Sequence, residues 1–397
     1  MNSKIKTNPF WLIITLALLT MVGPFTIDTY LPSFPSIEDY FHVDRVLMSQ
    51  SIAIYLFASA LSTLFWGALS DSIGRKIVIY VTLFIYILAS FGCAFTPDFT
   101  GFLFFRMLQG VAASGGMIVG RAIIRDAFDS TQAHRVMAYI MMVFALAPAV
   151  APIIGGYLQD SFGWQSVFYF LAIYGVIVAI MTNRILPETL KHEDKTSFHP
   201  VAVLKVYFRT LRNKRFQAII FTLGISFSGL ILYITGSPAI IFDILHLDSS
   251  SFAYEFVPVT SGIILGAFVS GKLSRYVTAK KIVVIAQFIM AIASLLNIAQ
   301  LNWLEVSIFS VVAPPTIYAI GIALQMPALS VLALDCFPHN RGSASAVQSF
   351  VHTILATLVT AIIVPMVAGN LGSFVAAQVS FFVAALVLWV LVCMREK

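Results

Sequence analysis

The amino-acid sequence predicts an all-α integral membrane protein with twelve transmembrane helices in two pseudo-symmetric bundles of six. Three observations lead to this prediction: the composition, the lengths of the apolar runs, and the positions of the positive charges. Hydrophobic residues make up 59% of the 397 residues and charged residues only 11%, whereas a soluble domain carries about 25% charged residues. So few charged side chains cannot cover a surface that faces water, and the excess of apolar residues must therefore face lipid.

The chain contains twelve apolar runs of the length that an α-helix needs to cross a bilayer, which is about 20 residues. None of them alternates apolar and polar residues, as the strands of a membrane β-barrel do. In the first half, the sequence predicts helices at residues 10–32, 50–69, 77–95, 101–121, 135–157 and 165–186. In the second half, it predicts helices at residues 216–241, 252–271, 282–299, 306–333, 343–368 and 373–394.

The positive charges indicate how the helices are oriented. With the N-terminus inside the cell, all 24 Lys and Arg residues except Arg45 and Arg106 fall at the cytoplasmic side. Cytoplasmic loops of membrane proteins carry such an excess of Lys and Arg. We therefore expect both termini to be cytoplasmic. The net charge of +6 is explained by this topology and does not require a nucleic-acid partner.

A charged segment at residues 187–215 separates the two groups of predicted helices. The sequence therefore predicts an N-terminal six-helix bundle at residues 1–186, a cytoplasmic central loop at 187–215 and a C-terminal six-helix bundle at 216–397. The second half of the loop has the composition of an amphipathic helix that lies on a membrane surface.

The loop after the second predicted helix of each half has a related sequence. Gly67-Ala-Leu-Ser-Asp-Ser-Ile in the first half corresponds to Gly271-Lys-Leu-Ser-Arg-Tyr-Val in the second, and each is followed by a pair of basic residues. Internal repeats are common in secondary transporters. We infer that a six-helix unit was duplicated.

Several other classes of protein fit the sequence poorly. Three scattered cysteines provide neither a disulfide framework nor a metal site, and we expect no metal. The sequence has no GxxxxGK[ST] motif, so ATP is not expected to be the direct energy source. A membrane-embedded enzyme or receptor would show a catalytic cluster or a sizeable soluble domain, and the sequence predicts neither.

The loop that begins at Gly67 resembles the signature loop of the major facilitator superfamily, Gly-x-Leu-x-Asp-x-x-Gly-Arg-Lys. It matches that pattern at Gly67, Leu69, Asp71, Gly74, Arg75 and Lys76. The resemblance implies the major facilitator fold and transport by alternating access, which also argues against a channel. It further implies that these residues form a conformational latch. In that latch, Asp71 would lie near the start of the eleventh helix, at Gly342-Ser343, where the helix dipole favours an anion.

Further motifs resemble the drug:proton antiporters and, among them, the Bcr/CflA subfamily. Arg106-x-x-Gln109-Gly110 is similar to a motif of the fourth antiporter helix. The stretch that contains Pro148, Pro152, Gly155 and Gly156 resembles the antiporter motif of the fifth helix. In this chain, Ala151 replaces the first glycine of that motif. Segments similar to the Bcr/CflA subfamily lie at residues 28–32, 120–126, 236–238 and 342–346.

Three ionisable residues fall inside the predicted helices: Asp28, Arg106 and Glu255. Such residues normally face the protein interior and find partners there. Asp28 and Arg106 lie at similar depths, so we expect a direct or water-bridged pair. Burial favours the neutral form of a carboxyl group and a guanidinium favours its ionised form, so this pair would suit proton coupling. A permanently ionised structural pair, or Asp28 as a residue at the outer rim, is the alternative.

Glu255 and His352 have open roles. Glu255 begins the eighth predicted helix, where an interfacial or first-turn carboxylate is the simplest interpretation and proton or cation binding is the alternative. His352 titrates near neutrality in water, but a lone polar residue packed between helices is more common.

Aromatic and amide side chains are candidates to line a substrate cavity, because aromatic walls suit planar or cationic compounds. The candidates are Tyr30, Tyr55, Gln109, Tyr139 and Tyr233.

By resemblance, the sequence predicts a proton-driven exporter of small, partly apolar compounds. Such a multidrug antiporter would contribute to antibiotic resistance, work as a monomer in the bacterial inner membrane, and use protons and no cofactor. A transporter of a native metabolite such as a siderophore, by export or uptake, is the alternative.

Overall fold

The computed structural model describes residues 9–190, 200–303, 305–338 and 341–394. Part of the predicted central loop, at 191–199, and the basic residues Lys4, Lys6, Arg395 and Lys397 lie outside these ranges. Two compact units, residues 1–203 and 204–397, make up the chain. The boundary between them falls inside the charged segment at 187–215.

Twelve helices of the described residues are long and apolar enough to cross a membrane, six in each unit. The number predicted from the apolar runs is therefore confirmed. In the N-terminal unit the elements are α1 (Pro9–Asp28), η1 (Leu31–Ser33), α2 (Phe34–Phe41), α3 (Arg45–Ile73), α4 (Arg75–Phe95), α5 (Phe99–Ala127), α6 (Ser130–Phe162) and α7 (Gln165–Ile185).

The C-terminal unit contains a short helix in addition to its six spans. Its elements are α8 (Pro200–Leu211), α9 (Lys214–Pro238), η3 (Ala239–Ile244), η4 (Ser249–Ser251), α10 (Phe252–Leu273), α11 (Ala279–Trp303), α12 (Ile308–Asp335), α13 (Arg341–Leu358), η5 (Val359–Ile363), α14 (Val364–Val367) and α15 (Leu371–Met394). The helix expected in the second half of the central loop is α8.

The first span is broken, although its sequence predicts one continuous helix at 10–32. α1 ends at Asp28, and a single 3₁₀ turn at Leu31–Ser33 leads into α2. Pro32 lies inside this turn and has no backbone N–H to continue the helical hydrogen bonds. The break leaves the last carbonyl groups of α1 without helical partners, which matters for the site described below.

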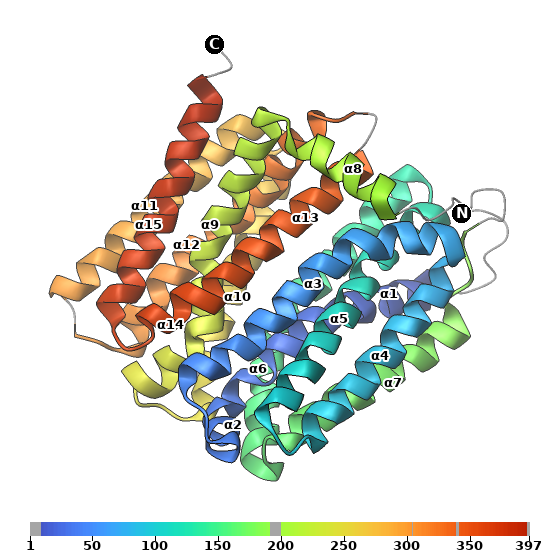
Figure 1. Ribbon diagram of the computed structural model, residues 1–397. Coiled ribbons are helices and arrows are strands. Elements are labelled where there is room, and N and C mark those ends of the chain that lie inside the picture. The colour runs from blue at the N-terminus through green and yellow to red at the C-terminus, as the bar shows by residue number, and fades with distance from the viewer. Residues whose placement is uncertain (1–8, 191–199, 304, 339–340, 395–397) are drawn as a thin grey trace. The chain divides into compact units, whose positions relative to one another are not determined.

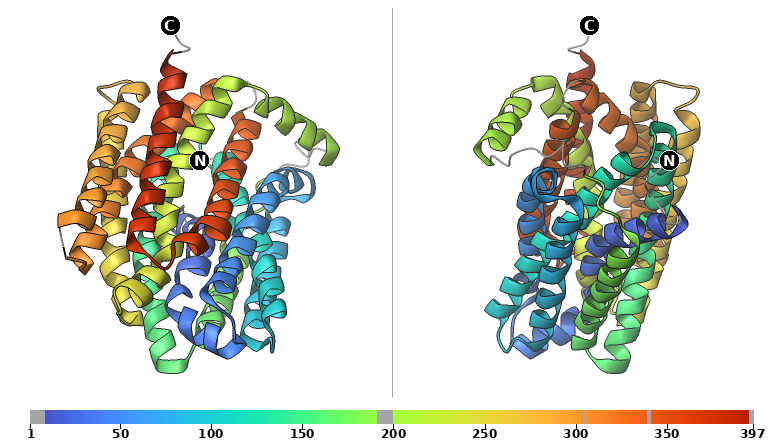
Figure 2. Two further views of the ribbon diagram at one scale, coloured as in Figure 1. Left: turned by 60° about the vertical axis from the view of Figure 1, so that its left-hand side comes forward. Right: turned by 90° about the vertical axis from the view of Figure 1, so that its right-hand side faces the viewer.

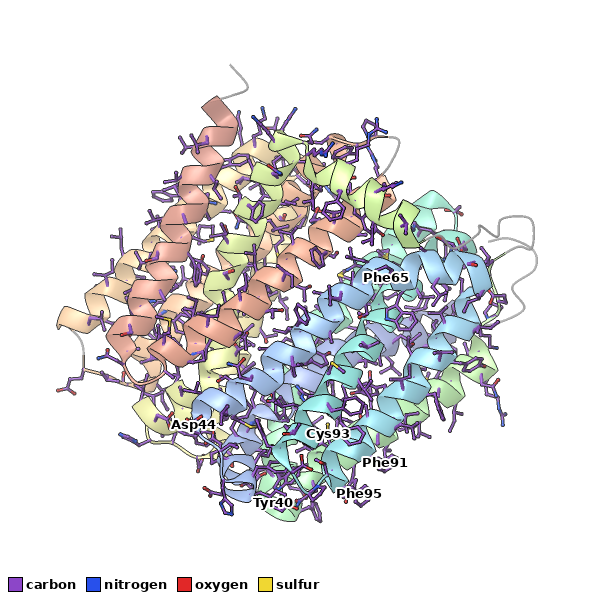
Figure 3. All side chains as sticks on the ribbon, viewed as in Figure 1. Tyr40, Asp44, Phe65, Phe91, Cys93 and Phe95 are labelled. Atoms are coloured by element: carbon purple, nitrogen blue, oxygen red, sulfur yellow. The ribbon has the colours of Figure 1, made fainter. Side chains whose placement is uncertain are left out.

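In the N-terminal unit, α5 packs against α3 on one side and α4 on the other, and α4 also packs against α7 (Figure 1). α1 packs against α5, α6 and α7. The side of α4 away from α5 is apolar and exposed: Phe91 and Phe95 are 38% and 70% exposed, while Cys93 between them is buried (Figure 3). This alternation places lipid-facing and interior residues on one helix, as expected for a membrane span.

In the C-terminal unit, α9 packs against α15, α12 and α13, and α12 also packs against α10 and α11. α15 runs beside α9 in the left view of Figure 2. The buried side chains in this interior include amides and hydroxyls as well as aliphatic groups. The amides become important for Glu255 below.

Candidate functional site

Arg106 is the largest fully buried side chain in the described structure and organises a polar cluster in the N-terminal unit. Its Nη1 atom donates hydrogen bonds to Gln109 Oε1 at 2.8 Å and to the Thr26 carbonyl at 3.2 Å. The guanidinium carbon lies 4.2 Å from the centre of the Tyr30 ring and 5.0 Å from that of Tyr55. A desolvated cation over an aromatic face gains about 2 kcal/mol. Two ring faces and a helix end thus stabilise the charge.

The unused hydrogen-bonding capacity of Arg106 makes the cluster unusual. Its Nε and Nη2 atoms are buried and have no hydrogen-bond partner among the described residues. Buried guanidinium N–H groups are nearly always satisfied, and an unsatisfied one costs about 1–3 kcal/mol or more. We therefore regard Arg106 as a cation with room for an additional acceptor.

The cluster extends across four helices through side-chain hydrogen bonds. Gln109 Nε2 donates to Ser90 Oγ on α4 at 2.9 Å, and Cys93 Sγ lies 3.7 Å from Gln109 Oε1. The Tyr30 and Ser51 hydroxyl groups lie 2.8 Å apart. Tyr30, Tyr55 and Gln109, which the sequence suggested as cavity-lining residues, thus all contact Arg106, and their role in a substrate cavity remains a prediction. We call these four residues the Arg106 cluster.

Asp28 is the last residue of α1 and is only 4% exposed. Of the direct or water-bridged pair expected between Asp28 and Arg106, the direct form is not present in this conformation, in which Arg106 donates to the Thr26 carbonyl. The physical reason is the early end of α1: its free carbonyls carry the negative end of the helix dipole and accept the guanidinium. The carbonyl that accepts from Arg106 belongs to Thr26, two residues before Asp28, so both side chains are located at the same end of α1. The water-bridged form remains a prediction.

The two other tyrosines proposed to line a cavity do not join this cluster. Tyr139 lies on α6 with half of its surface exposed, and no described hydrogen bond or ring contact connects it to Arg106. Tyr233 belongs to the C-terminal unit, where Asn297 Nδ2 donates to its hydroxyl group at 2.7 Å. A groove of about 430 Å³ between α4 and α7, with Tyr80 and Asn183 at one end, contains no residue of the cluster.

The motif on α6 packs against the end of α1. α6 runs continuously from Ser130 to Phe162 through Pro148 and Pro152. A Cβ atom on Gly155 would lie 1.8 Å from the Thr29 carbonyl oxygen, so only glycine permits this contact. Because Thr29 follows Asp28, the motif glycine touches the chain next to the buried carboxyl group.

Residues 67–76, which we call the latch loop, comprise the end of α3, Gly74 and the start of α4, and they are held together by Arg75. This side chain is 8% exposed and forms ion pairs with Asp71 and, through Nε, with Asp126 Oδ2 at 3.1 Å. Its Nη1 atom also donates to Ser70 Oγ at 2.6 Å. Gly74 has φ of +117°, a conformation that residues with a Cβ atom rarely adopt. The structure thus places the motif residues in one interlocked turn.

Glu188 is a member of this turn that the sequence analysis missed. Its carboxylate accepts hydrogen bonds from the backbone N–H groups of Arg75 at 3.1 Å and of Lys76 at 3.0 Å. It therefore caps the N-terminus of α4, where the helix dipole favours an anion. A Cβ atom on Gly74 would lie 2.8 Å from Glu188 Oε2, so the glycine also makes room for this carboxylate.

A signal for Glu188 was present in the sequence. Glu188 is an acidic residue directly after Pro187, at the junction of the sixth span and a basic segment. Sequence reasoning assigned the anion at a helix N-terminus to Asp71 instead. The expected contact of Asp71 with Gly342-Ser343 would join the two units and remains a prediction.

The family model for the Major Facilitator Superfamily matches residues 16–359. An uncharacterized transporter of this type from Bacillus subtilis, YdgK, is 30% identical over 356 residues, covering 88% of this chain and 87% of the relative. The bicyclomycin resistance protein homolog of Haemophilus influenzae is 31% identical over 278 residues, covering 70% and 69%. The multidrug resistance protein MdtL of a Shewanella strain is 28% identical, covering 86% and 85%.

Among solved structures, a D-xylose-proton symporter matches with a TM-score of 0.76 at 14% identity, covering 96% of this chain and 97% of the symporter. At this identity the match concerns the fold alone. The names of the curated relatives agree with the predicted drug:proton antiporter subfamily. The family model, the twelve spans and the fold together show that this chain is a multi-pass membrane transporter of the major facilitator superfamily.

Proposed function

We propose that this protein is a proton-coupled exporter of small, partly apolar compounds in the bacterial inner membrane. The observation that carries the proposal is the Arg106 cluster: a buried cation with two unpartnered N–H-bearing nitrogens beside a buried carboxyl group. The names of the relatives, which include multidrug and bicyclomycin resistance proteins, support an exported drug as the cargo.

In the proposed mechanism, Arg106 exchanges one acceptor for another. When Asp28 carries a proton, Arg106 remains on the Thr26 carbonyl, as in this conformation. When Asp28 releases its proton, the carboxylate attracts the guanidinium. The Nε and Nη2 atoms of Arg106 have no hydrogen-bond acceptor in this conformation and can donate to the carboxylate. The end of α1 then moves relative to α5, because both residues sit where these helices meet.

The movement of the α1 end would be transmitted to α6 by direct contact, with no other segment between them. Gly155 contacts the Thr29 carbonyl with no space between them. A shift of the α1 end must therefore displace α6 or be opposed by it. This contact gives the motif on α6 a physical role in coupling a proton to the alternation of the carrier.

The cargo that best fits the cluster is neutral or cationic. Ring faces of Tyr30 and Tyr55 bind cations and planar groups, and a cation on the cargo would compete with the proton for Asp28. Such competition would release the proton on cargo binding, as antiport requires. We further propose that the carrier functions as a monomer with both termini in the cytoplasm.

The test uses inside-out membrane vesicles with a respiration-driven pH gradient that is followed by the quenched fluorescence of an acridine dye. We expect at least one compound from a panel of antibiotics, cationic dyes and siderophores to restore the fluorescence with wild-type protein. Asp28→Asn should abolish this response, whereas Asp39→Asn, an exposed acid on α2, should leave it intact. Full activity of Asp28→Asn would refute the assignment of Asp28, and a siderophore as the only active compound would redirect the cargo class.

A further inference from the structure

Glu255 is a second buried carboxyl group, and the proposed mechanism does not use it. It lies in the first turn of α10, as expected, and is only 3% exposed, so its carboxyl group is buried within the protein. Among the acidic residues that the structure describes, only Asp28 and Glu255 are buried. Each unit therefore buries one carboxyl group.

No positive charge accompanies Glu255. All the Lys and Arg side chains described between residues 204 and 397 are exposed. Lys272, the nearest of them along α10, is 17 residues away, which is roughly 25 Å along a helix. The Oε2 atom of Glu255 is buried without a hydrogen-bond donor among the described residues.

The groups around Glu255 are neutral. α10 packs mainly against α12 and also touches α9 and η4. From α9, Tyr233 lies within electrostatic reach of Glu255. From α12, the buried Tyr318 donates its hydroxyl proton to the Ser226 carbonyl at 2.9 Å. η4 contributes serines, and Asp248 before it is exposed.

An amide network lies beyond Tyr233 and also carries no net charge. Asn297 Nδ2 donates to the Tyr233 hydroxyl oxygen at 2.7 Å and to Gln378 Oε1 at 3.0 Å, and Gln378 Nε2 donates to Ser294 Oγ at 3.1 Å. The network thus carries no charge that could compensate an ionised Glu255.

A buried carboxylate with neither a donor nor a cation is strongly disfavoured, and such a group takes up a cation instead. A metal ion needs several ligands, and the described residues contain no group of three or more His, Cys, Asp and Glu side chains that could hold one. A proton needs neither a cavity nor further ligands.

We propose that Glu255 is a second proton-binding residue of the carrier, which holds a proton in this conformation and releases it when water reaches the first turn of α10. Release is aided by the position of Glu255 at a helix N-terminus, where the dipole favours the ionised form. The inference goes beyond the proposed function, since it adds a second proton site in the other unit. It predicts that fewer protons are exchanged per cargo molecule when Glu255 is replaced.

The test measures infrared difference spectra of the purified full-length protein in lipid nanodiscs between acidic and alkaline buffer. Glu255→Gln and Asp28→Asn should each remove one component of the protonated-carboxyl C=O band. Glu305→Gln, which replaces an exposed acid of the same unit, should leave the band unchanged. Glu255→Asp should shift its component and keep it, which tests the assignment should the Gln variant fold poorly.

An unchanged band in Glu255→Gln, together with an unshifted band in Glu255→Asp, would overturn the proposal, because Glu255 would then not carry a proton. The Asp28 component is read separately. Its absence, with the Glu255 component present, would count against the proposed function and leave the present inference standing. If the wild-type spectrum contains the Asp28 component but no Glu255 component, the present inference fails and the role proposed for Asp28 is unaffected.

Discussion

The two loops with related sequences differ in how they are built. In the latch loop, Arg75 is buried against Asp71 and Asp126, and Glu188 caps the helix that follows. In the second loop, which begins at Gly271, most residues are exposed, and a Cβ atom on Gly271 would have no atom within 4 Å.

One substitution accounts for much of this difference. Arg275 occupies the position in the second loop that Asp71 occupies in the first. The second loop therefore has a basic residue at the position of the acid that pairs with Arg75 in the first loop. The comparison teaches that a repeated sequence need not build the same turn: Gly74 alone separates α3 from α4, whereas residues 274–278 separate α10 from α11, and Arg275 replaces the acid that pairs with Arg75 in the first copy. Paired substitutions in the two loops test this difference.

Replacing Arg75 should have the largest effect on stability. Arg75→Ala leaves Asp71 and Asp126 without their shared cation and removes a buried side chain, and breaking a buried ion pair costs about 3–5 kcal/mol. Because Asp71 is 43% exposed, we expect the lower end of this range. Arg275→Ala, at an exposed site, should stay within about 0.5 kcal/mol of wild type. Thermal unfolding in detergent measures both, and equal effects would contradict the comparison.

Gly74→Ala should have the next largest effect. The new methyl group requires a strained backbone and collides with Glu188, which together should cost more than about 1 kcal/mol. Gly271→Ala, at the position of the second loop that corresponds to Gly67, is the control, since it lies in α10 in open space and alanine favours helix by up to about 1 kcal/mol. The unfolding temperature should fall for the first variant and stay level or rise for the second. A fall in both would show that the two turns are equally constrained.

Glu188→Gln should have a smaller effect. The amide oxygen still accepts one hydrogen bond from α4, but the favourable interaction between the carboxylate and the helix dipole is lost, which is about 0.3–1 kcal/mol. The same unfolding assay should show the loss at low salt and a smaller one at high salt, because salt screens this interaction. A loss that is independent of salt would indicate a steric role for Glu188.

Replacing Asp248 should have the smallest effect on the unfolding temperature. It provides a comparison with Glu188 at the start of another helix. Hydrogen bonds from Ser250 and Ser251, at 2.7 and 2.9 Å, lower the pKa of the Asp248 carboxyl group. Its contribution to stability is therefore present above the ordinary Asp pKa of about 3.9 and is lost as the pH falls through the lower folded value. Asp248→Asn should lower the unfolding temperature slightly at neutral pH and not in strong acid. A larger effect than that of Glu188→Gln would reverse the expected order.

The sequence was sufficient for the fold and for part of the site. Hydropathy predicted the twelve spans, and the motif that contains Arg106 and Gln109 was recognised, but the contact between these two side chains was found only in the structure. Sequence position gives the depth of a residue along a helix, but not the direction in which its side chain points. For that reason the sequence did not show that Arg106 donates to the Thr26 carbonyl, and Tyr139 proved half exposed.

Contacts between distant segments were also beyond the sequence. Glu188 meets Arg75 across more than a hundred residues, and no local pattern encodes this contact. The burial of Glu255 depends on how α9 and α12 cover the start of α10, which the apolar runs alone do not specify. The role of His352 remains a prediction. So do the predicted ends of the two bundles at residues 186 and 216.

The most direct test of proton-coupled export uses proteoliposomes containing purified protein and a compound that restores dye fluorescence in the vesicle assay. With an acid-inside pH gradient as the only driving force, the account predicts that the compound accumulates in the lumen against its own gradient. It also predicts that this accumulation disappears with Asp28→Asn or after a protonophore collapses the gradient. Accumulation that persists without the pH gradient, or at the wild-type rate with Asp28→Asn, would contradict the account.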